Sequence, residues 1–364
     1  MFSVASCLID GDMIQFFTVR NLADWLMEGK GNGLSEAIIS RPRAWAFVNN
    51  PFAIPTTPAV AVLFEEGEMK GYAAVFSERF EGVAPTIYWG STFFVDASLR
   101  GKGCGVKILS ALQESLDGVY ATTQTPVSSS AIFKKLGAGE VWFPEYWIKL
   151  QRNNPTKGKR AVLKQGYNRL NAVLFQKRNH LLRWCDSFHF QLEYVSFIDD
   201  ETYSFIRQHQ GKDLLMRSKE MMNWMLRYPF LQNVVLEKEV KKGFNYFSCN
   251  KSDFQQYAVK VLSEAGELVG FYMFKYNEGE VNLLYLYYTP DSKEMVMASF
   301  YKHLLKMEIV RLRTTSLELV SFFKRNALPV VNTSESRLNL CAPKVLAIPE
   351  GATIQGGDGD MFVI

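Results

Sequence analysis

The chain has 364 residues, of which 48% are apolar and 14% aromatic, and its formal net charge is +4. The length favours two domains, and the apolar content excludes a largely disordered chain. Five scattered cysteines without metal-ligand spacing, an N-terminus without a basic region and the lack of a long apolar run favour a cytoplasmic protein with no metal site and no membrane span.

The first 150 residues alternate extended and helical patterns. Two β-rich runs, at residues 57–64 and 69–76, are separated by a charged stretch that contains Gly67, which predicts a hairpin. A strand is expected at 86–95, and apolar residues at helical spacing predict a helix at 106–116. The elements expected next are a short strand at 118–122, a helix at 128–136 and a strand pair at 140–150. This succession predicts an α/β unit with a mixed sheet.

Residues 151–185 differ from their neighbours because they contain nine Lys and Arg residues and no acidic residue. Apolar residues recur there at helical spacing, so a basic amphipathic helix is expected. Such a helix could bind an anionic partner such as tRNA, a nucleotide-sugar or a membrane surface. The regular apolar stripe between two slightly acidic segments favours a connecting strut instead.

The third segment repeats the first in outline. Gly67 to Tyr72 is echoed in the second half of the chain by Gly266 to Phe271, again between two β-rich runs. The elements expected there are strands at 256–262, 268–276 and 280–289, a helix at 292–307 and a short helix around 322–325. Their shared order predicts an internal duplication. The predicted domains are residues 1–150 and 186–364, joined by the helix at 151–185.

Glycines at alternate positions, Gly101, Gly103 and Gly105, stand between a predicted strand and a predicted helix. They allow a tight turn that brings bare backbone N–H groups against an anion, and the helix adds the positive end of its dipole. Two cations, Arg100 and Lys102, lie in the same loop. The loop therefore predicts a pyrophosphate site. Nucleotide-hydrolysis and dinucleotide-binding patterns do not match it.

The loop resembles the signature of the GNAT superfamily of acyl-CoA N-acyltransferases. Val95 ends a strand, and Arg100-Gly101-Lys102-Gly103-Cys104-Gly105 matches the family's [RQ]-x-x-G-x-[GA] loop. A second family pattern, Y-x-K-L-G-[FA], is matched by Phe133-Lys134-Lys135-Leu136-Gly137-Ala138 except at its first position. The resemblance covers roughly residues 1–150.

The resemblance implies that the loop's N–H groups hold the pyrophosphate of coenzyme A. The end of the preceding strand would pair with the pantetheine arm and polarise the thioester carbonyl. The side chains of Arg100 and Lys102 either add positive potential or are solvated loop charges, and Ser129 either contacts the pantetheine or lies in a run that caps its helix. The residues expected at the coenzyme A site are Phe93, Phe94, Val95, Arg100, Gly101, Lys102, Gly103, Cys104, Gly105, Ser129 and Phe133.

One departure from the family pattern concerns the general acid. Many family members have a tyrosine at the position of Phe133 that protonates the leaving thiolate, and phenylalanine cannot donate a proton. Tyr88 and Tyr146 are the candidate substitutes, and Glu78 and Glu145 are the candidate bases for the attacking amine. Each is also compatible with a packing or surface role.

The second copy has no glycine in the corresponding loop, Thr289 to Glu294, so no coenzyme A is expected there. Together with the resemblance, the sequence therefore predicts an N-acyltransferase that uses acetyl-CoA or another acyl-CoA and acts on an amine of a small molecule. Two alternatives remain open. One is a transferase that uses an aminoacyl-tRNA donor, although nucleic acid is not the favoured partner. The other is a non-catalytic acyl-CoA-binding protein, since Phe133 leaves the acid unassigned.

Overall fold

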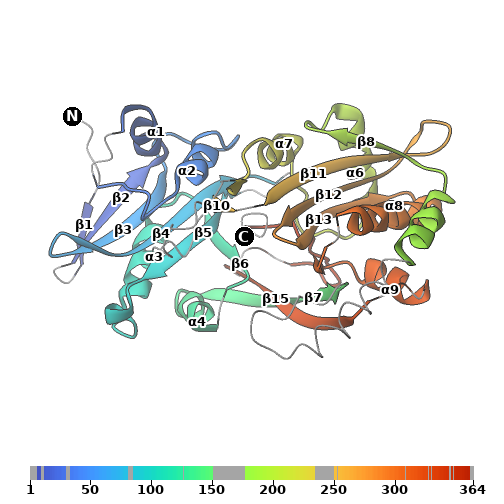
Figure 1. Cartoon of the computed structure of the whole chain (residues 1–364). Helices are drawn as coiled ribbons and strands as arrows, with labels where there is room; N and C mark the ends of the chain where they lie inside the picture. The colour runs from blue at the N-terminus through green and yellow to red at the C-terminus, as the bar shows by residue number, and fades with distance from the viewer. Residues whose placement is uncertain are drawn as a thin grey trace, which may run out of the picture.

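The chain folds into a long mixed sheet with helices packed against it (Figure 1). In this computed structural model the described residues are 6–9, 12–29, 33–80, 85–125, 127–150, 177–233, 250–251, 253–307, 309–326, 328, 330–343, 346 and 348–360. No helix within them is long and apolar enough to cross a bilayer. The elements of the first half are β1 (Ser6–Ile9), β2 (Asp12–Thr18), α1 (Val19–Glu28), α2 (Arg41–Val48), β3 (Pro58–Glu65), β4 (Glu68–Glu78), β5 (Ile87–Val95), η1 (Ala97–Leu99), α3 (Cys104–Glu114), β6 (Val119–Thr123), α4 (Val127–Lys135) and β7 (Ala138–Lys149).

The second half begins with helical residues 177–186, which belong to the predicted connecting helix; residues 151–176 of that prediction lie outside the described residues. Its further elements are β8 (Gln191–Val195), α6 (Asp200–His209), α7 (Lys219–Arg227), β9 (Gln232–Asn233), β10 (Asn250–Lys251), β11 (Phe254–Leu262), β12 (Leu268–Asn277), β13 (Glu280–Tyr288), η2 (Pro290–Ser292), α8 (Lys293–Lys306), β14 (Arg311–Thr314), α9 (Leu317–Arg325) and β15 (Asn332–Pro343). The domain boundaries at 150 and 186 stay predictions.

The two halves repeat one topology, which confirms the mixed α/β fold class and the duplication expected from the sequence. The order β3-β4-β5-η1-α3-β6-α4-β7 recurs as β11-β12-β13-η2-α8-β14-α9-β15. In each half three antiparallel strands are followed by a parallel one. The register of β4 against β5 shifts after Ala74, and that of β12 against β13 shifts after Met273, its counterpart in the alignment that pairs Gly67 with Gly266. Each shift marks a β-bulge that bends the strand.

A pair of glycines supports the same correspondence. A Cβ on Gly71 in β4 would lie 2.7 Å from the Ile108 side chain of α3, and a Cβ on Gly270 in β12 would overlap the Val296 side chain of α8. The same alignment of the halves pairs these two glycines with each other. Each lets a helix pack directly on the backbone of its sheet.

The last strands of the two halves are exchanged. The sheet order within the described residues is β1-β2-β3-β4-β5-β6-β15-β7-β14-β13-β12-β11-β8. Thus β7 of the first half pairs with β14 of the second, and β15 of the second pairs with β6 of the first. The strand pair predicted over residues 140–150 is wrong, because β7 is one continuous strand whose partners come from the other half. No glycine or asparagine lies between Glu140 and Leu150 to form the expected turn.

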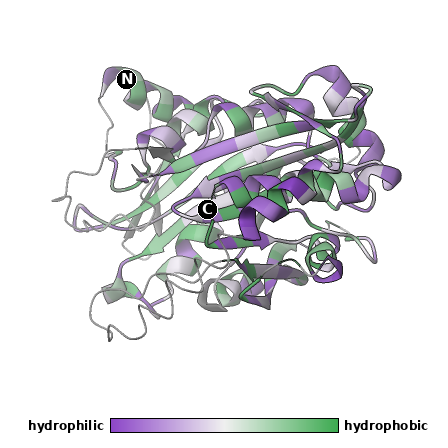
Figure 2. Ribbon diagram, turned by 45° about the vertical axis from the view of Figure 1, so that its right-hand side comes forward, coloured by the Kyte–Doolittle hydropathy of each residue, from purple (hydrophilic) through white to green (hydrophobic). Residues whose placement is uncertain are grey.

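The halves also share a hydrophobic cluster. Phe47 of α2, Phe76 of β4, Trp224 of α7 and Phe230 pack with ring centroids 5.5–6.3 Å apart. The indole N–H of Trp224 donates to the backbone oxygen of Ala46 at 2.7 Å. Figure 2 shows hydrophobic segments along the strands and on the helices beside them. Trp224 is therefore a core residue, and the neighbouring Met221, Met222 and Met225 of α7 are buried with it.

Replacing Gly270 by alanine is expected to lower the free energy of unfolding by about 1–3 kcal/mol, because the new methyl group would overlap the Val296 side chain. Denaturant unfolding of Gly270→Ala measures this. Combining Gly270→Ala with Val296→Ala should cost less than the sum of the single changes, since the second change removes the clashing atoms. Strict additivity would contradict the assigned contact.

Candidate functional site

The glycine-rich loop connects β5 to α3. The Asp96 carboxylate accepts a hydrogen bond from the backbone N–H of Ser98 at 2.8 Å and so caps the short helix η1. Gly101 and Gly103 then adopt φ angles of 81° and 84°, which disfavour any residue with a Cβ. A Cβ at either position would meet no heavy atom of the described chain within 4 Å. The loop therefore presents bare, accessible backbone.

The first turn of α3, directly after this loop, has backbone N–H groups without an acceptor in the helix. The N–H groups of Cys104, Gly105 and Val106 are the first of the helix and have no carbonyl acceptor within it. The helix dipole adds partial positive charge at the same end. Arg100 and Lys102 are exposed beside it. This end of α3 can accept an anion such as a pyrophosphate.

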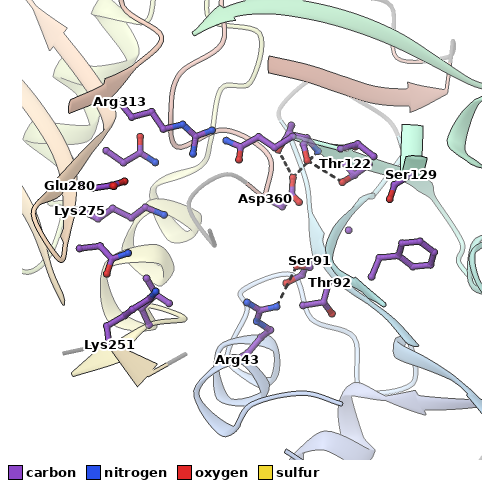
Figure 3. Close-up of a pocket in the computed structure, with 18 of the residues that line it drawn as sticks. Arg43, Ser91, Thr92, Thr122, Ser129, Lys251, Lys275, Glu280, Arg313 and Asp360 are labelled. Carbon is purple, nitrogen blue, oxygen red and sulfur yellow. Dashed lines mark hydrogen bonds between the residues drawn. The ribbon is translucent and has the colours of Figure 1, made fainter. Parts of the chain in front are cut away.

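A cavity of about 610 Å³ opens where β5 and β6 diverge. The two strands pair only as far as Trp89 opposite Ala121, and the residues beyond that pair line the cavity. The facing wall comes from the second half (Figure 3). The first half contributes Gly90, Ser91, Thr92 and Phe93 from β5, Tyr120, Thr122 and Thr123 from β6, and Ser129 and Phe133 from α4.

The glycine loop and the cavity adjoin. A Cβ on Gly105 would lie 2.9 Å from Cζ of Phe93, and Phe93 lines the cavity. Of the residues predicted for coenzyme A, Phe93, Ser129 and Phe133 line the cavity. Phe94, on the same strand, stacks instead on Tyr72 with ring centroids 5.5 Å apart. Val95 ends the strand at the start of the loop, and the side chain of Cys104, at the start of α3, is buried in the cluster beneath that helix.

The bulge of β5 lies within the cavity wall. Gly90 stands opposite Val75 and Thr92 opposite Ala74, which leaves Ser91 as the extra residue. The carbonyl oxygen of Ser91 accepts a hydrogen bond from Nη1 of Arg43 at 3.3 Å. Among the described strands, β5 has a neighbour beyond Trp89 only on its β4 side. The other edge of its backbone is available to a ligand.

The four catalytic candidates of the sequence lie outside the described cavity lining. The hydroxyl of Tyr88 donates to Asp117 in the cluster beneath α3, and Tyr146 packs in the core of the second half. Glu78 is buried, lies 3.1 Å from Nη1 of Arg217 and accepts a hydrogen bond from Trp89. Burial raises the pKa of Glu78 to about 7, against the opposing effects of these two neighbours.

The fourth candidate, Glu145, contacts residues that line the cavity but does not line it itself. Its carboxylate is 2.5 Å from Arg313 and accepts a hydrogen bond from the indole of Trp147 at 3.1 Å. Arg313 and Trp147 themselves line the cavity. Glu145 therefore holds two cavity residues in place, and a catalytic role for it stays a prediction, as for the other three.

Tyr120 is a cavity residue that the sequence did not single out. Its ring stacks on Phe133 with centroids 5.5 Å apart, and its hydroxyl would overlap a Cβ on Gly90. Because Gly90 has no side chain, the Tyr120 hydroxyl can lie directly against the backbone of β5. Burial, and then the Asp360 carboxylate, raise the pKa of Tyr120 far above its ordinary value, so the hydroxyl keeps its proton at neutral pH.

Asp360 also escaped prediction, because its partner Thr123 is distant in the sequence. Its carboxylate accepts hydrogen bonds from the backbone N–H of Thr123, at 2.8 Å, and from the Thr123 hydroxyl. Burial raises the pKa of Asp360 to about 6, and Thr123 and Arg217 oppose that rise. Above this pH the carboxylate is available as a base at the centre of the cavity (Figure 3).

In the second half, the segment that carries Asp360 lies where β13 and β14 diverge, which corresponds to the position of the cavity between β5 and β6. β13 and β14 pair only as far as Asn282 opposite Arg313. Beyond that point the N–H of Gly357 donates to the oxygen of Leu284, the bulge residue equivalent to Ser91, at 2.8 Å. The chain's own backbone therefore occupies the position that is open in the first half.

The loop of the second half also differs. Four residues separate β13 from α8, whereas eight separate β5 from α3. Pro290 begins η2, and Lys293 at the start of α8 is 2.5 Å from Glu318. This loop contains no glycine.

Comparisons with known proteins show likeness at the level of the fold. No family model matches the chain, and no curated protein matches it. Similar solved structures include GCN5-related N-acetyltransferases, as the loop motif predicts; one from Kribbella flavida aligns at 12% identity and a TM-score of 0.48, covering 90% of this chain and 70% of its own. A tandem GNAT protein from the clavulanic acid biosynthesis pathway aligns at 12% identity and 0.46, covering 91% and 98%. Saccharomyces cerevisiae N-myristoyltransferase with bound myristoyl-CoA aligns at 10% identity and 0.49, covering 93% and 84%. At these TM-scores the likeness carries no argument about activity.

The Asp360→Asn variant is expected to change how stability depends on pH. The folded-state pKa of about 6 exceeds the ordinary 3.8, so the folded state holds more protons between these values, and this group's contribution to stability falls as the pH rises. Asparagine keeps an acceptor for Thr123 but does not ionise. Relative to the unchanged chain, the variant should gain up to about 3 kcal/mol between pH 4 and pH 7 in denaturant unfolding. A constant difference across this range would contradict the assignment.

Proposed function

We propose that this chain is an acyl-CoA-dependent N-acyltransferase that moves an acyl group, most simply acetyl, from coenzyme A to an amine. One observation carries the proposal. The exposed loop around Gly101 and Gly103, at the N-terminus of α3, adjoins the cavity between β5 and β6 through the contact of Gly105 with Phe93. An anionic head group and an extended arm with its own amide groups would match this path.

Coenzyme A would lie along the first half. Its pyrophosphate would accept hydrogen bonds from the N–H groups of residues 101–105. Its pantetheine arm, which contains two amides, would pair with the free edge of β5 near Phe93. The thioester would then lie beside the bulge at Ser91, with Ser129 and Phe133 on the opposite side. This path uses the residues that the sequence predicts and that line the cavity.

The acceptor amine would attack the thioester carbonyl from the side of the second half. A new C–N bond forms, the C–S bond breaks, and the amine must lose a proton while the thiolate gains one. We assign Asp360 as the group that takes the amine proton and Tyr120 as the group that protonates the thiolate. Both side chains line the cavity. With a pKa of about 6, Asp360 is still mostly ionised at neutral pH and is a stronger base than an ordinary carboxylate, while Tyr120 keeps the proton that it would donate.

Thermal shift and thiol release test the proposal and its alternatives. Acetyl-CoA, and not tRNA, is expected to raise the melting temperature. Thiol release with a panel of amines then separates an enzyme from a non-catalytic acyl-CoA-binding protein. Stabilisation by tRNA alone would favour the aminoacyl-tRNA-dependent alternative instead.

The Gly103→Val variant is expected to weaken acetyl-CoA binding at least tenfold, because the side chain would cover the backbone N–H groups and strain the left-handed turn. Isothermal titration measures the dissociation constant. Gly67→Val is the matched control, since Gly67 has a φ of 81° and equally open surroundings in the hairpin between β3 and β4. Similar losses of stability with unequal losses of binding support the site; equal binding in both variants contradicts it.

The Tyr120→Phe variant is expected to lower kcat for acyl transfer by about 10² to 10⁴-fold, with little change in the KM for acetyl-CoA, because the ring stacking remains and only the proton donor is lost. Tyr88→Phe is the control, since Tyr88 is a buried tyrosine of the neighbouring strand whose hydroxyl is bound by Asp117. A loss of kcat in Tyr88→Phe alone would reverse this assignment in favour of Tyr88.

A further inference from the structure

The wall contributed by the second half carries a row of polar side chains across three strands. Lys275 on β12 stands opposite Asn282 on β13, and Asn282 stands opposite Arg313 on β14. Directly opposed residues of neighbouring strands point to the same face of a sheet. All three line the cavity, and Figure 3 shows Lys275 and Arg313 on the side away from Ser129.

The row is compact and largely shielded from water. Neighbouring strands lie about 4.8 Å apart, so the backbones at Lys275 and Arg313 are about 10 Å apart, with the Asn282 amide between them. Lys275 is only 4% exposed and Asn282 is 8% exposed. Lys251 on β10 adds a third cation to the same wall. In such a place of low dielectric, each charge acts strongly on its neighbours.

Positive charge exceeds negative charge at this end of the cavity. Apart from Asp360 at the centre of the cavity, the charged described residues that the second half contributes to the lining are the three cations and one acidic side chain, Glu280. Glu280 is itself paired with Arg311, and Arg313 is paired with Glu145. Burial, followed by repulsion from Arg313 and Lys251, lowers the pKa of Lys275 to about 7. A bound anion would relieve this repulsion and favour the charged lysine.

Coenzyme A does not account for this row. Its phosphates are assigned to the N-terminus of α3, which adjoins the cavity through Phe93 on the opposite wall. We propose that the acceptor carries an anionic group, a carboxylate or a phosphate, which binds to Lys275, Asn282 and Lys251 while its amine points toward Asp360. This inference rests on the proposed acyl transfer and specifies its acceptor class.

The test compares acceptors with and without an anionic group. One pair is an α-amino acid and its carboxamide, and the other is an amino sugar 6-phosphate and the unphosphorylated amino sugar. Thiol release from acetyl-CoA gives kcat/KM for each. At least one anionic member should exceed its neutral partner by tenfold or more, and the pair that shows this identifies carboxylate or phosphate as the recognised group. Equal values within both pairs would overturn the proposal.

Two variants connect the preference to the row. Lys275→Gln and Asn282→Asp are each expected to lower kcat/KM for the anionic acceptor about tenfold more than for its neutral partner. Asn282→Asp is nearly isosteric and places a carboxylate between the two cations, so it tests the site even if Lys275→Gln folds poorly. Equal losses for both acceptors in both variants would indicate a structural role and overturn the proposal.

Lys260→Gln is the matched control. Lys260 is a lysine of the adjacent strand β11, is 5% exposed, and pairs with Asp199 at 2.8 Å outside the cavity lining. Its loss should lower stability without changing the charge preference. Failure of the proposed function is distinguished by acetyl-CoA itself. A chain that neither binds acetyl-CoA nor releases thiol contradicts both proposals, whereas turnover without charge preference contradicts only the acceptor assignment.

Discussion

The exchange of the final strands, β7 and β15, is the constraint on which the rest of the structure depends. These strands pair along their whole length, from Ala138 opposite Pro343 to Lys149 opposite Asn332, and β6 and β14 flank them. Neither half can complete its sheet without the other. Pro144 is tolerated in β7 because β14 has already ended there, so that among the described strands only β15 pairs with it. The cavity lies where the two halves meet, and its lining residues come from both.

Duplication followed by divergence explains why one half is open and the other is closed. Both halves keep the bulge and the glycine beneath the helix, features that shape the strands around a central opening. The first half also keeps the long glycine loop. In the second half the loop is shorter, and residues near Gly357 occupy the opening by pairing with Leu284. The second half instead contributes a wall that contains Lys251, Lys275 and Arg313, so the two walls of the cavity differ in composition.

Local sequence patterns predicted many of the strands and helices and the glycine-rich loop. They did not predict which strands pair across the two halves. The hairpins, the helices after each third strand and the echo of Gly67 to Tyr72 in the second half follow from periodicity and turn residues, which act over short distances. The pairing of residues 140–150 depends on residues 332–343, which are distant in the sequence, so no local signal could show the exchange of strands. Tyr120 and Asp360 were missed for the same reason. The strand of Tyr120 is buried along its whole length, so its pattern singles out no residue, and the partner of Asp360, Thr123, is 237 residues away in the sequence.

The buried pair of Glu78 and Arg217 connects the packing of the halves to the site. Both side chains are at most 1% exposed, and a buried pair tolerates the loss of either partner poorly because the other charge is left uncompensated. Arg217, from the second half, also donates a hydrogen bond to the carbonyl oxygen of Gly359. That bond fixes the residue before Asp360, whose carboxylate then meets Thr123. Glu78, which the sequence suggested as a base, therefore has no place in the cavity lining. It contacts Arg217, which binds the backbone next to Asp360, and Asp360 is the carboxylate that faces the cavity.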